Sequence, residues 1–445
     1  MTNLENQHVL VMGLGVSGRA AADFLLRRGA CVHAVDGDMN LLQRNPEIEG
    51  LRQRGVKISH EEAIADPSGF QLVVISPGIP QTHPLRALAK AAGVEIIGEV
   101  ELACRFLKGP FLGITGTNGK TTTTLLTTHI LNCSGRSACA LGNVGVAMTS
   151  EAAERALVGN QIIVAELSSF QLETLHSPII DAAVVLNITP DHLDRYSGME
   201  AYAEAKMHIA QRIKPKGVLY LEKKCCDEFG YLLKGIAPKT YGYTQDSDLF
   251  TDLHNLFINN KLVCVLPCAY QGGKSHDLEN VMAAYALCNH LGVTAQQFIE
   301  ALASFKKPAH RIEFVKKIGE VAYYDDSKGT NIDAVMRAVE ALRGDIVLIA
   351  GGVDKGAAYT PWIAAFNNRV KCICAIGQAA PKIKQDLGHA LHVELLNTLE
   401  EAVAFAARIA APGDNVLLSP GCASFDMFRD YVHRGKEFQR AVEQL

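Results

Sequence analysis

The segment "GITGTNGKTTTT", residues 113–124, has the residue types needed to hold a nucleoside triphosphate. It follows an apolar run and precedes a helical pattern, so its loop should present backbone N–H groups to phosphates. Lys120 can neutralise phosphate charge, and the Thr121 hydroxyl can bind Mg²⁺. Ile114 stands where this pattern usually has glycine, and a structural turn with a surface lysine is the alternative. We predict ATP contacts at Gly116, Thr117, Asn118, Gly119, Lys120, Thr121 and Thr122.

A second glycine-rich loop lies near the N-terminus. Gly13, Gly15 and Gly18 form a G-x-G-x-x-G pattern between an apolar run and a helical pattern. Such a loop brings the backbone close to a diphosphate, and Asp36 follows the next apolar run, where a ribose-binding acid would lie. The pattern fits NAD, FAD or a nucleotide diphosphate sugar equally well, and it also fits a structural tight turn. Gly78 follows a further apolar run and could line the same crevice.

Several polar side chains follow apolar runs at places where ligands gather in parallel α/β sheets. Glu166 offers a hard carboxylate ligand suited to Mg²⁺, although it could equally begin a helix. His192 lies in a loop between Asp191 and Asp194 and could be a metal ligand or an ordinary loop histidine. Lys206, read from its helical segment alone, is a solvated lysine. Residue types alone therefore leave these roles open.

The order of apolar runs and helical patterns predicts the fold that must position these residues. Short apolar runs alternate with helical patterns along the chain, which is typical of parallel α/β units. The chain of 445 residues is long enough for about three domains. We place one boundary near Gly98 and a hinge at 306–310, where a proline breaks the helical pattern. The predicted domains are residues 1–98, 99–306 and 307–445.

Composition excludes several classes of protein. The net charge of -4 argues against a general nucleic-acid binder. The N-terminal residues lack a signal-type pattern, and no apolar run approaches the ~18 residues that span a bilayer. The 12 cysteines lack zinc-type spacing, so we expect reduced and mostly buried thiols. These features predict a cytoplasmic protein without membrane or nucleic-acid partners, and a monomer is the plain expectation.

Seven stretches occur along the chain in the order GTNGKTT, AELSSFQLE (165–173), NITPDHLDRY (187–196), YAEAK (202–206), HR (310–311), DDSKGTN (325–331) and SPGCASFDMF (419–428). Together they resemble the motifs of the Mur ligase family, the ATP-dependent enzymes that build the peptide of peptidoglycan. The resemblance spans essentially the whole chain. It implies a three-domain α/β fold, with a Rossmann-like N-terminal domain, a central P-loop ATPase-like domain with a parallel sheet, and a Rossmann-like C-terminal domain.

The resemblance also implies an activity. Family members are ADP-forming ligases that make an amide bond through an acyl phosphate. The segments DDSKGTN and SPGCASFD resemble those of the member that adds D-glutamate to UDP-N-acetylmuramoyl-L-alanine in cytoplasmic peptidoglycan precursor synthesis. Other members typically have a histidine-containing segment where this chain has Asp326-Ser327-Lys328. The implied cofactors are ATP and Mg²⁺ at two sites, and the implied partners are the two small-molecule substrates.

In this family the N-terminal domain holds uridine diphosphate rather than a dinucleotide. The resemblance therefore assigns the first glycine loop to the UDP moiety and places Asp36 near the uracil ring. The implied UDP-binding residues are Gly13, Gly15, Val16, Ser17, Gly18, Asp36 and Gly78.

The central motifs imply the catalytic groups. Thr121 and Glu166 would hold one Mg²⁺, and Lys120 would stabilise phosphate charge. His192 and Lys206, the latter as a carbamate formed with CO₂, would hold a second Mg²⁺. Asn143 would contact the reacting phosphoryl or acyl group.

The later motifs imply further contacts to ATP and to the amino acid. ATP would contact Asn280, Arg311 and Asp326, and Lys328 would be a further catalytic residue that closes over the nucleotide with Asp326. Asp277 departs from the family's usual asparagine. D-Glutamate would contact Thr330, Lys355, Ser424 and Tyr431, and Tyr431 stands where phenylalanine is expected. On residue type alone, Lys355 could equally be a surface lysine.

Three rival functions remain open from the sequence. A sister amide ligase would keep the central ATP site and change the DDSKGTN segment. An NAD-binding oxidoreductase would use the first glycine loop, but it would have no need for the second. A non-catalytic nucleotide-binding module would be expected to lack Lys120, Glu166 or His192, and all three are present. For a ligase with shared ligands, we expect residues 307–445 to move about the hinge near Pro308.

Overall fold

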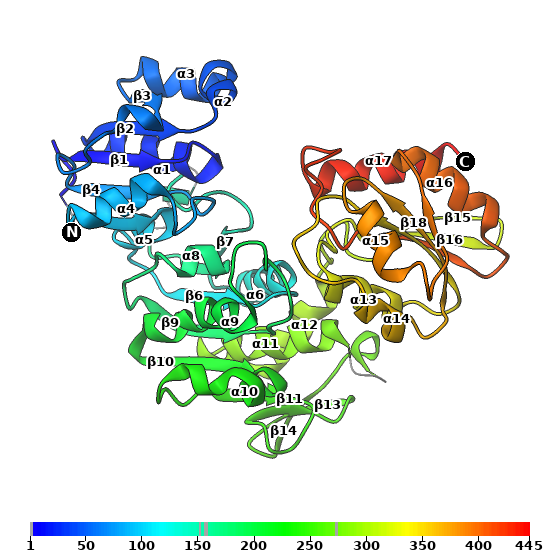
Figure 1. The fold of residues 1–445 in the computed structure, drawn as a ribbon. Helices are drawn as coiled ribbons and strands as arrows, with labels where there is room; N and C mark the ends of the chain where they lie inside the picture. The colour runs from blue at the N-terminus through cyan, green and yellow to red at the C-terminus, as the bar shows by residue number, and fades with distance from the viewer. Residues whose placement is uncertain (1–2, 151–152, 155–158, 272–274) are drawn as a thin grey trace. The chain divides into compact units, whose positions relative to one another are not determined.

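Three β-sheets organise the chain in the computed structural model, which describes residues 3–150, 153–154, 159–271 and 275–445 (Figure 1). Most strand pairs in these sheets are parallel, and helices connect them. The predicted α/β fold is therefore confirmed. Each sheet lies within one of the three predicted ranges: β1–β5 before residue 99, β6–β14 between 111 and 265, and β15–β20 after 312.

The N-terminal sheet has five parallel strands in the order β3-β2-β1-β4-β5. This is the strand order of the first part of a Rossmann fold. The strands are β1 (His8–Met12), β2 (Cys31–Asp36), β3 (Lys57–His60), β4 (Leu72–Ile75) and β5 (Glu95–Gly98). The helices are α1 (Val16–Arg27), α2 (Met39–Arg44), α3 (Pro46–Gln53), α4 (Pro84–Ala91) and α5 (Glu99–Cys104), with the short 3₁₀ helix η1 (Glu61–Ala63).

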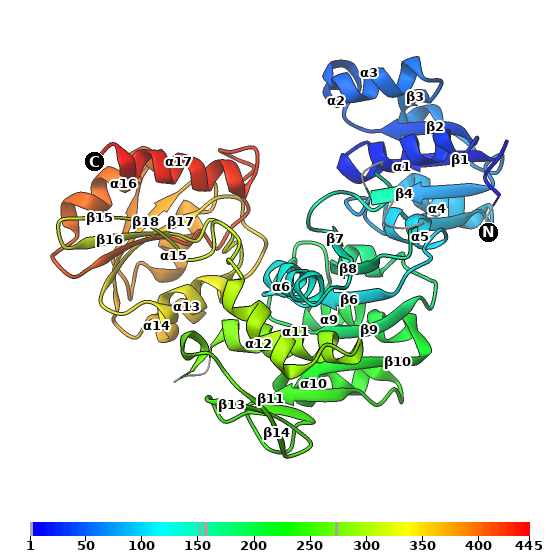
Figure 2. The same ribbon diagram turned by 180° about the vertical axis from the view of Figure 1, so that it is seen from behind.

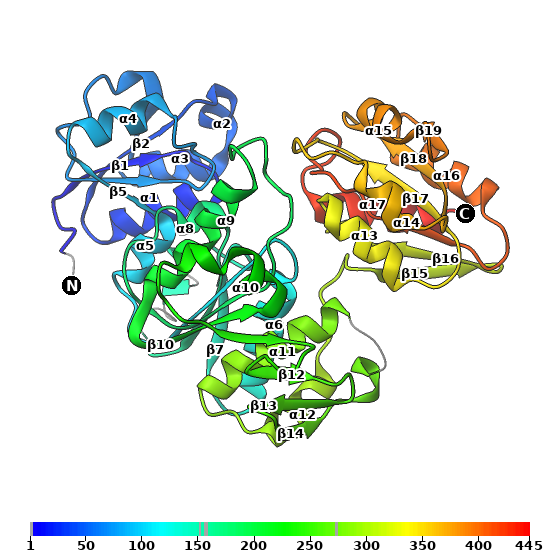
Figure 3. The same cartoon turned by 60° about the horizontal axis from the view of Figure 1, so that its bottom comes forward.

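The central sheet has nine strands in the order β14-β13-β12-β11-β10-β9-β6-β8-β7. The strands β6 to β12 form a parallel set in which β6 lies between β9 and β8, and the antiparallel strands β13 and β14 form one edge (Figure 3). Strands β6 and β8 are buried along their whole length, which explains why they read as continuous apolar runs. The strands are β6 (Phe111–Thr115), β7 (Ala138–Gly142), β8 (Ile162–Glu166), β9 (Ile180–Val185), β10 (Ile213–Glu222), β11 (Lys239–Gly242), β12 (Leu249–Thr251), β13 (Asn255–Ile258) and β14 (Lys261–Val265).

Helices α6, α11 and α12 pack together against the central sheet and share one apolar core with it (Figure 2). The helices of this region are α6 (Lys120–Cys133), α8 (Ser169–Leu172), α9 (Met199–Met207), α10 (Lys223–Phe229), α11 (His276–His290) and α12 (Ala295–Ser304). Short 3₁₀ helices are η2 (His208–Arg212), η3 (Gly230–Leu233) and η4 (Cys268–Tyr270).

The C-terminal sheet has six strands in the order β15-β16-β20-β17-β18-β19, and only β15 is antiparallel to its neighbour. One core joins the sheet to α13, α14 and α15, and another joins it to α16 and α17, so helices cover both faces (Figure 2). The strands are β15 (Glu313–Ile318), β16 (Val321–Asp325), β17 (Ile346–Gly351), β18 (Val370–Ile376), β19 (Val393–Leu395) and β20 (Asn415–Leu418). The helices are α13 (Ile332–Ala341), α14 (Pro361–Phe366), α15 (Ala380–Leu387), α16 (Leu399–Ile409) and α17 (Tyr431–Glu443).

Contacts divide the chain into two compact units. One unit contains residues 1–187 and 203–305, and the other contains 188–202 and 306–445. The division after Phe305 falls at the predicted hinge. The segment 188–202, which the sequence analysis placed in the central domain, groups instead with the C-terminal residues.

Two expectations from composition can be compared with the structure. Among the described residues, no helix is both long enough and apolar enough to cross a membrane. All the cysteines are free thiols, but Cys31, Cys133 and Cys268 are exposed. The expectation of mostly buried thiols therefore holds for only part of them.

Candidate active site

The first glycine loop joins β1 to α1 and is shaped by two close approaches. Gly13 has φ +84°, in the left-handed region that favours glycine. A Cβ atom on Gly18, in the first turn of α1, would lie 1.7 Å from the carbonyl oxygen of Gly13, so only glycine lets the helix pass this close to the loop. In contrast, a Cβ atom on Gly15 would meet nothing within 4 Å. The open side of the loop at Gly15 is where a ligand could approach the backbone.

Asp36 stabilises this loop from the end of β2. Its Oδ2 accepts a 2.6 Å hydrogen bond from the backbone N–H of Leu14, and its Oδ1 accepts one of 2.9 Å from the N–H of Asp38. Ser76, after β4, donates to the carbonyl oxygen of Gly13 at 2.8 Å. Asp36 therefore stabilises the loop itself, in addition to any contact that it makes with a ligand. Val16, the first residue of α1, has 70% of its surface exposed. Gly78 lies two residues past Ser76 and has open space where a side chain would be.

The second glycine loop joins β6 to α6. Gly116 and Gly119 have φ +148° and +86°, and a Cβ atom on Gly119 would lie 2.3 Å from the Oδ1 of Asn280. Asn187, after β9, holds the loop by accepting backbone N–H bonds from Thr117 and Asn118, both at 2.8 Å. The sequence analysis missed Asn187, although its place at the end of an apolar run was a signal. Thr121 and Thr122 lie buried in the first turn of α6.

Two lysines converge on one carbonyl oxygen of this loop. Lys120 Nζ and Lys206 Nζ each donate to the Gly116 carbonyl oxygen at 2.8 Å, and Lys120 also donates to the Thr117 carbonyl oxygen. Lys206 is only 1% exposed, so the interpretation of a solvated helix lysine is wrong. A buried lysine loses hydration, and its position at the loop puts positive charge where phosphate oxygens would lie.

Glu166 and Asn143 form a pair beside this loop. Asn143 Nδ2 donates to Glu166 Oε1 at 2.8 Å, and the backbone N–H of Asn143 donates to the Glu166 carbonyl oxygen at 2.9 Å. Glu166 is paired in register with Ile114 on β6, two residues before Gly116. Its other carboxylate oxygen, Oε2, is buried without a hydrogen-bond partner among the described residues. A buried carboxylate oxygen in that state fits a bound cation, because an unpaired buried charge is costly.

Asn280 lies on α11, one side of which packs against α6. Its Oδ1 accepts a 3.0 Å bond from the Thr123 hydroxyl, and Asn280 is 7% exposed. At the start of the same helix, His276 Nδ1 lies 2.9 Å from Glu279 Oε2. The structure thus brings Asn280 to the second glycine loop and leaves Asp277 in the first turn of α11.

In the C-terminal unit, the segment 188–202 contributes a charged contact. Lys355 Nζ donates to Asp191 Oδ1 at 3.0 Å, and Asn331 Nδ2 donates to Asp191 Oδ2 at 3.4 Å. His192 follows with φ +55°. Lys355 is therefore not an ordinary surface lysine, because its ammonium group is paired with a carboxylate that is itself buried.

The segment 310–312 pairs with the loop after β16. The backbone N–H of Lys328 donates to the His310 carbonyl oxygen at 3.1 Å, and that of Ile312 donates to Asp326 Oδ1 at 3.3 Å. Burial raises the pKa of Asp326 to about 7, against the opposing effects of the Ser419 hydroxyl bond and the nearby Arg311 charge. The structure thus gathers Arg311, Asp326 and Lys328.

The three predicted amino-acid-binding segments are tied to one another by backbone hydrogen bonds. Val353 and Ala423 exchange bonds of 2.8 and 3.1 Å, which joins the loop of Lys355 to the loop of Ser424. The N–H of Gly421 donates to the carbonyl oxygen of Gly329, next to Thr330, at 2.8 Å. Tyr431, at the start of α17, has its ring centroid 3.9 Å from Lys328 Nζ. Thr330, Lys355, Ser424 and Tyr431 therefore belong to one group of loops.

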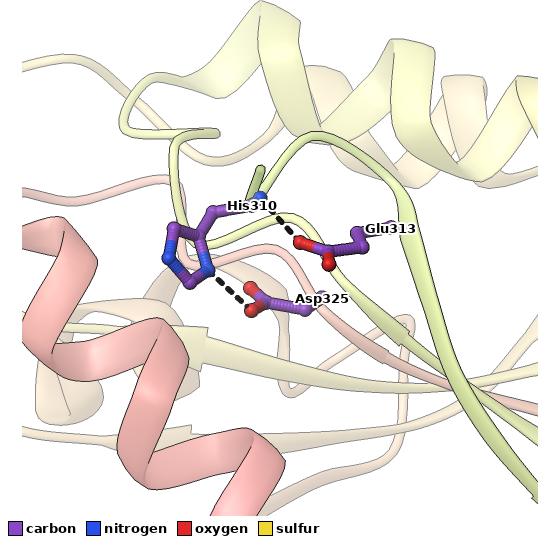
Figure 4. Close-up of side chains that lie close together, drawn as sticks. All are labelled: His310, Glu313 and Asp325. Carbon is purple, nitrogen blue, oxygen red and sulfur yellow. Dashed lines mark hydrogen bonds and ion pairs between the residues drawn. The ribbon is translucent and has the colours of Figure 1, made fainter. Parts of the chain in front are cut away.

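A further cluster, missed by the sequence analysis, surrounds His310 (Figure 4). His310 Nδ1 lies 2.6 Å from Asp325 Oδ2, and the His310 N–H donates to Glu313 Oε2 at 2.7 Å. The hydrogen bond to Asp325 raises the pKa of His310. Asp325 also accepts bonds from Gln439 Nε2 and from the N–H of Ser327. The Asp325 carboxylate already accepts these hydrogen bonds. The cluster therefore fits a role in stabilising the 325–329 loop better than a metal site.

Comparison with protein-family models assigns the chain to a family. Residues 7–98 match the Mur ligase MurD-like N-terminal domain, residues 114–293 the Mur ligase middle domain, and residues 310–422 the Mur ligase glutamate ligase domain. The chain belongs to the Mur ligase family.

Individual relatives sharpen the comparison. The chain is 49% identical over 443 residues to the UDP-N-acetylmuramoylalanine--D-glutamate ligase of Protochlamydia amoebophila, covering 100% of this chain and 99% of that protein. It is 38% identical to the ligase of the same name from Trichlorobacter lovleyi, covering 99% and 100% of the two chains.

Solved structures show the same fold at low sequence identity. UDP-N-acetylmuramate-alanine ligase MurC from Thermotoga maritima is 17% identical, with a TM-score of 0.61 and coverage of 99% and 100% of the two chains. MurF from Acinetobacter baumannii is also 17% identical, with a TM-score of 0.62 and coverage of 98% and 91%. The predicted three-domain α/β architecture agrees with these structures.

Proposed function

We propose that this chain is an ATP-dependent ligase that joins D-glutamate to UDP-N-acetylmuramoyl-L-alanine in cytoplasmic peptidoglycan precursor synthesis. Full-length similarity to relatives named for this reaction supports the choice of substrates. The observation that carries the mechanism is Glu166 Oε2, which is buried without a hydrogen-bond partner among the described residues. Glu166 is in register with Ile114, just before the loop whose Gly116 carbonyl oxygen accepts from two lysines.

The reaction has two steps. The alanyl carboxylate oxygen attacks the γ-phosphorus of ATP, and ADP leaves, giving an acyl phosphate. The amine of D-glutamate then attacks the acyl carbon, inorganic phosphate leaves and the amine loses a proton. Both steps need charge stabilisation and positioning more than a strong base. Lys120 supplies positive charge to the β- and γ-phosphates, and Asn143 orients the reacting group from its bonds to Glu166.

Magnesium fits the donor set at this loop. Glu166 Oε2 and the Thr121 hydroxyl are oxygen ligands of the kind that Mg²⁺ prefers. When bound, Mg²⁺ neutralises phosphate charge as it develops. A second Mg²⁺ would use His192 and a carbamate on Lys206.

The carbamate on Lys206 is supported by the position of that side chain. The reaction joins the lysine amine to CO₂ with loss of a proton, and it replaces a cation by an anionic oxygen ligand. Lys206 is buried and lies at the Gly116 carbonyl oxygen, where two ammonium groups now meet. Converting one of them to an anion would relieve that repulsion and add a ligand for a cation.

D-Glutamate carries two carboxylates and one amine. Lys355, Thr330, Ser424 and Tyr431 would receive it in the group of loops described above. Lys355 already pairs with one carboxylate, that of Asp191, which shows that its ammonium group can engage such a partner. The UDP moiety would lie on the first glycine loop, at Gly13, Gly15, Val16, Ser17, Gly18, Asp36 and Gly78. The enzyme would act as a monomer on these small molecules.

The decisive experiment measures phosphate release from ATP and Mg²⁺ with UDP-N-acetylmuramoyl-L-alanine. D-Glutamate, L-glutamate, L-lysine, meso-diaminopimelate and no amino acid are compared, and the product mass is determined. We expect release only with D-glutamate and a product heavier by one glutamyl unit. Release with another amino acid instead would reject the specificity, and no release with any would reject the ligase function. Nicotinamide cofactor binding, measured in parallel, tests the oxidoreductase alternative.

A further inference from the structure

We propose that Arg434 is a positioning residue that sets the spacing of the loops that receive the amino acid. This inference rests on the proposed function, because it assigns those loops to D-glutamate. Arg434 lies in the first turn of α17, three residues after Tyr431, and is only 1% exposed.

The guanidinium group of Arg434 binds two loops at once. Nε donates to the Ser327 hydroxyl at 3.0 Å, and Nη2 donates to the Ser327 carbonyl oxygen at 2.9 Å. Both Nη1 and Nη2 donate to the Cys422 carbonyl oxygen at 3.2 Å, and Nη1 donates to that of Ala423 at 3.4 Å. The planar fork of an arginine is suited to such a set of acceptors.

Two of the three residues that supply these acceptors, Ser327 and Ala423, are next to residues proposed to bind a substrate. Ser327 lies between Asp326 and Lys328, and Ala423 precedes Ser424. Ala423 also exchanges hydrogen bonds with Val353, two residues before Lys355. Arg434 therefore fixes the loops that carry Lys328, Ser424 and Lys355 relative to one another.

The third loop lies against the guanidinium group through a glycine. A Cβ atom on Gly352 would lie 3.2 Å from Arg434 Nη1 and 2.2 Å from the Ala423 carbonyl oxygen. Gly352 has φ +130°, which other residues rarely adopt. The Ala423 carbonyl oxygen and the Arg434 guanidinium group therefore lie too close to Gly352 to leave room for a side chain there.

Charge balance shows that Arg434 is not a simple ion-pair residue. Among the described residues, no carboxylate lies within ion-pair distance of its guanidinium group, and its partners are a hydroxyl and three carbonyl oxygens. Burial lowers the pKa of Arg434 to about 10. Burying a cation without a carboxylate in contact is unfavourable, so the five hydrogen bonds of the guanidinium group must offset its lost hydration. Arginine at this position holds the two loops that supply its acceptors in a fixed geometry.

The test compares Arg434→Lys with Arg440→Gln, a control on the same helix at an exposed arginine that pairs with Glu437. Lysine keeps the charge and loses the fork. We expect the KM for D-glutamate to rise about tenfold or more in Arg434→Lys, because small misplacements of a binding group are costly. The KM for UDP-N-acetylmuramoyl-L-alanine should stay within about twofold, because its UDP moiety is assigned to the first glycine loop, to which none of the residues bonded to Arg434 belongs. The control should match the wild type.

Ser327→Ala removes one acceptor and provides a milder variant should Arg434→Lys fail to fold. We expect a smaller rise in the same KM, because the Ser327 hydroxyl accepts only one of the five Arg434 bonds. The effects should be less than additive in the double variant, because the two side chains are in contact. An unchanged KM for D-glutamate in either single variant would overturn the proposal. So would an equal rise in the KM of all three substrates, or a loss of kcat with every KM unchanged, since these indicate general structural damage.

Amide hydrogen exchange separates this inference from the proposed function, because it needs no activity. Arg434→Lys should speed exchange at the N–H groups of Gly421, Val353 and Ala423, which bond between loops. The N–H groups within β17 and β18 should stay protected. If the wild type used a different amino acid, or none, faster exchange confined to these loops would still support positioning by Arg434. Unchanged exchange would reject it.

Discussion

The two glycine loops of this protein have the same strand–turn–helix construction, but the side chains that contact them have opposite charge. The first loop, between β1 and α1, receives a carboxylate: Asp36 accepts the N–H of Leu14. The second, between β6 and α6, receives two ammonium groups, from Lys120 and Lys206, at a single carbonyl oxygen. A loop that only holds a diphosphate can rely on backbone N–H groups and a helix N-terminus. A loop at which a phosphoryl group is transferred must also stabilise charge that develops during reaction.

The largest effect should come from Lys120→Ala. The variant removes the ammonium group that we propose stabilises the transferred phosphoryl group, so we expect kcat to fall by roughly a thousandfold. Binding of UDP-N-acetylmuramoyl-L-alanine, measured by calorimetry without ATP, should be unchanged. Phosphate-release kinetics give the first quantity. Weaker binding of the UDP substrate in this variant would show that the two loops are not separate in function.

A variant of the first loop should give the reverse pattern. Gly18→Ala places a Cβ atom 1.7 Å from the Gly13 carbonyl oxygen, so the loop must distort. We expect the free energy of unfolding to fall by about 2 kcal/mol or more, as for overpacking in a core. The KM for the UDP substrate should rise while that for ATP is retained.

Gly15→Ala is the matched control for that loop. Its backbone conformation, φ -61° and ψ -171°, suits alanine, and the added Cβ atom meets nothing. Stability should therefore be kept, and only binding of the UDP substrate should weaken. Equal loss of stability in the two variants would contradict the steric argument.

Stability should also depend on pH through Asp326, in the loop after β16. Burial raises its pKa to about 7 from the ordinary value of 3.8, so the folded state holds the proton when the unfolded state has lost it. Stability from this group is present below pH 4 and is lost as the pH rises toward 7. At 1.36 kcal/mol per pKa unit, the loss is roughly 4 kcal/mol.

Urea denaturation of Asp326→Asn across this range measures the effect. The variant should lose less stability than the wild type as the pH rises from 4 to 8. The hydrogen bond that raises the pKa of His310 contributes in the same direction in both proteins, so the difference between them isolates Asp326. Parallel pH profiles would contradict the burial argument.

The smallest effect should come from Asp36→Asn, which tests what holds the first loop. An amide oxygen still accepts the N–H of Leu14 but without charge, so we expect a loss of about 1 kcal/mol in the free energy of unfolding. Binding of the UDP substrate should weaken modestly, and phosphoryl transfer at saturating substrate should be unchanged. Chemical denaturation and a KM measurement check both parts.

Much of this molecule could be predicted from local sequence. The alternation of apolar runs and helical patterns gave the α/β class, because parallel strands buried on both faces are continuous apolar segments. Glycines at 13, 116 and 119 marked the two loops because a positive φ is a local requirement for glycine, and Gly18 did so because it approaches the nearby carbonyl oxygen of Gly13. The motif order also indicated the Mur ligase family, to which the family models assign the chain.

Other features depended on residues far apart in the chain. Lys206 reads locally as a solvated lysine, but it is buried against Gly116, 90 residues away. Asp191 lies 164 residues from Lys355, and Ser327 lies 107 from Arg434. Periodicity within a segment reports which face of a helix is apolar, and it carries no information about which distant segment packs there.

The sequence by itself thus determined the strand–loop–helix units, the two glycine loops and the family. Only the tertiary structure decided that 188–202 groups with the C-terminal unit, that Lys355 is paired with Asp191 and that Arg434 joins two loops. The physical reason is the distance along the chain over which each interaction acts. Backbone conformation is set by a few neighbouring residues, whereas burial and the partners of a charged side chain are set by packing between segments that meet only in the folded chain.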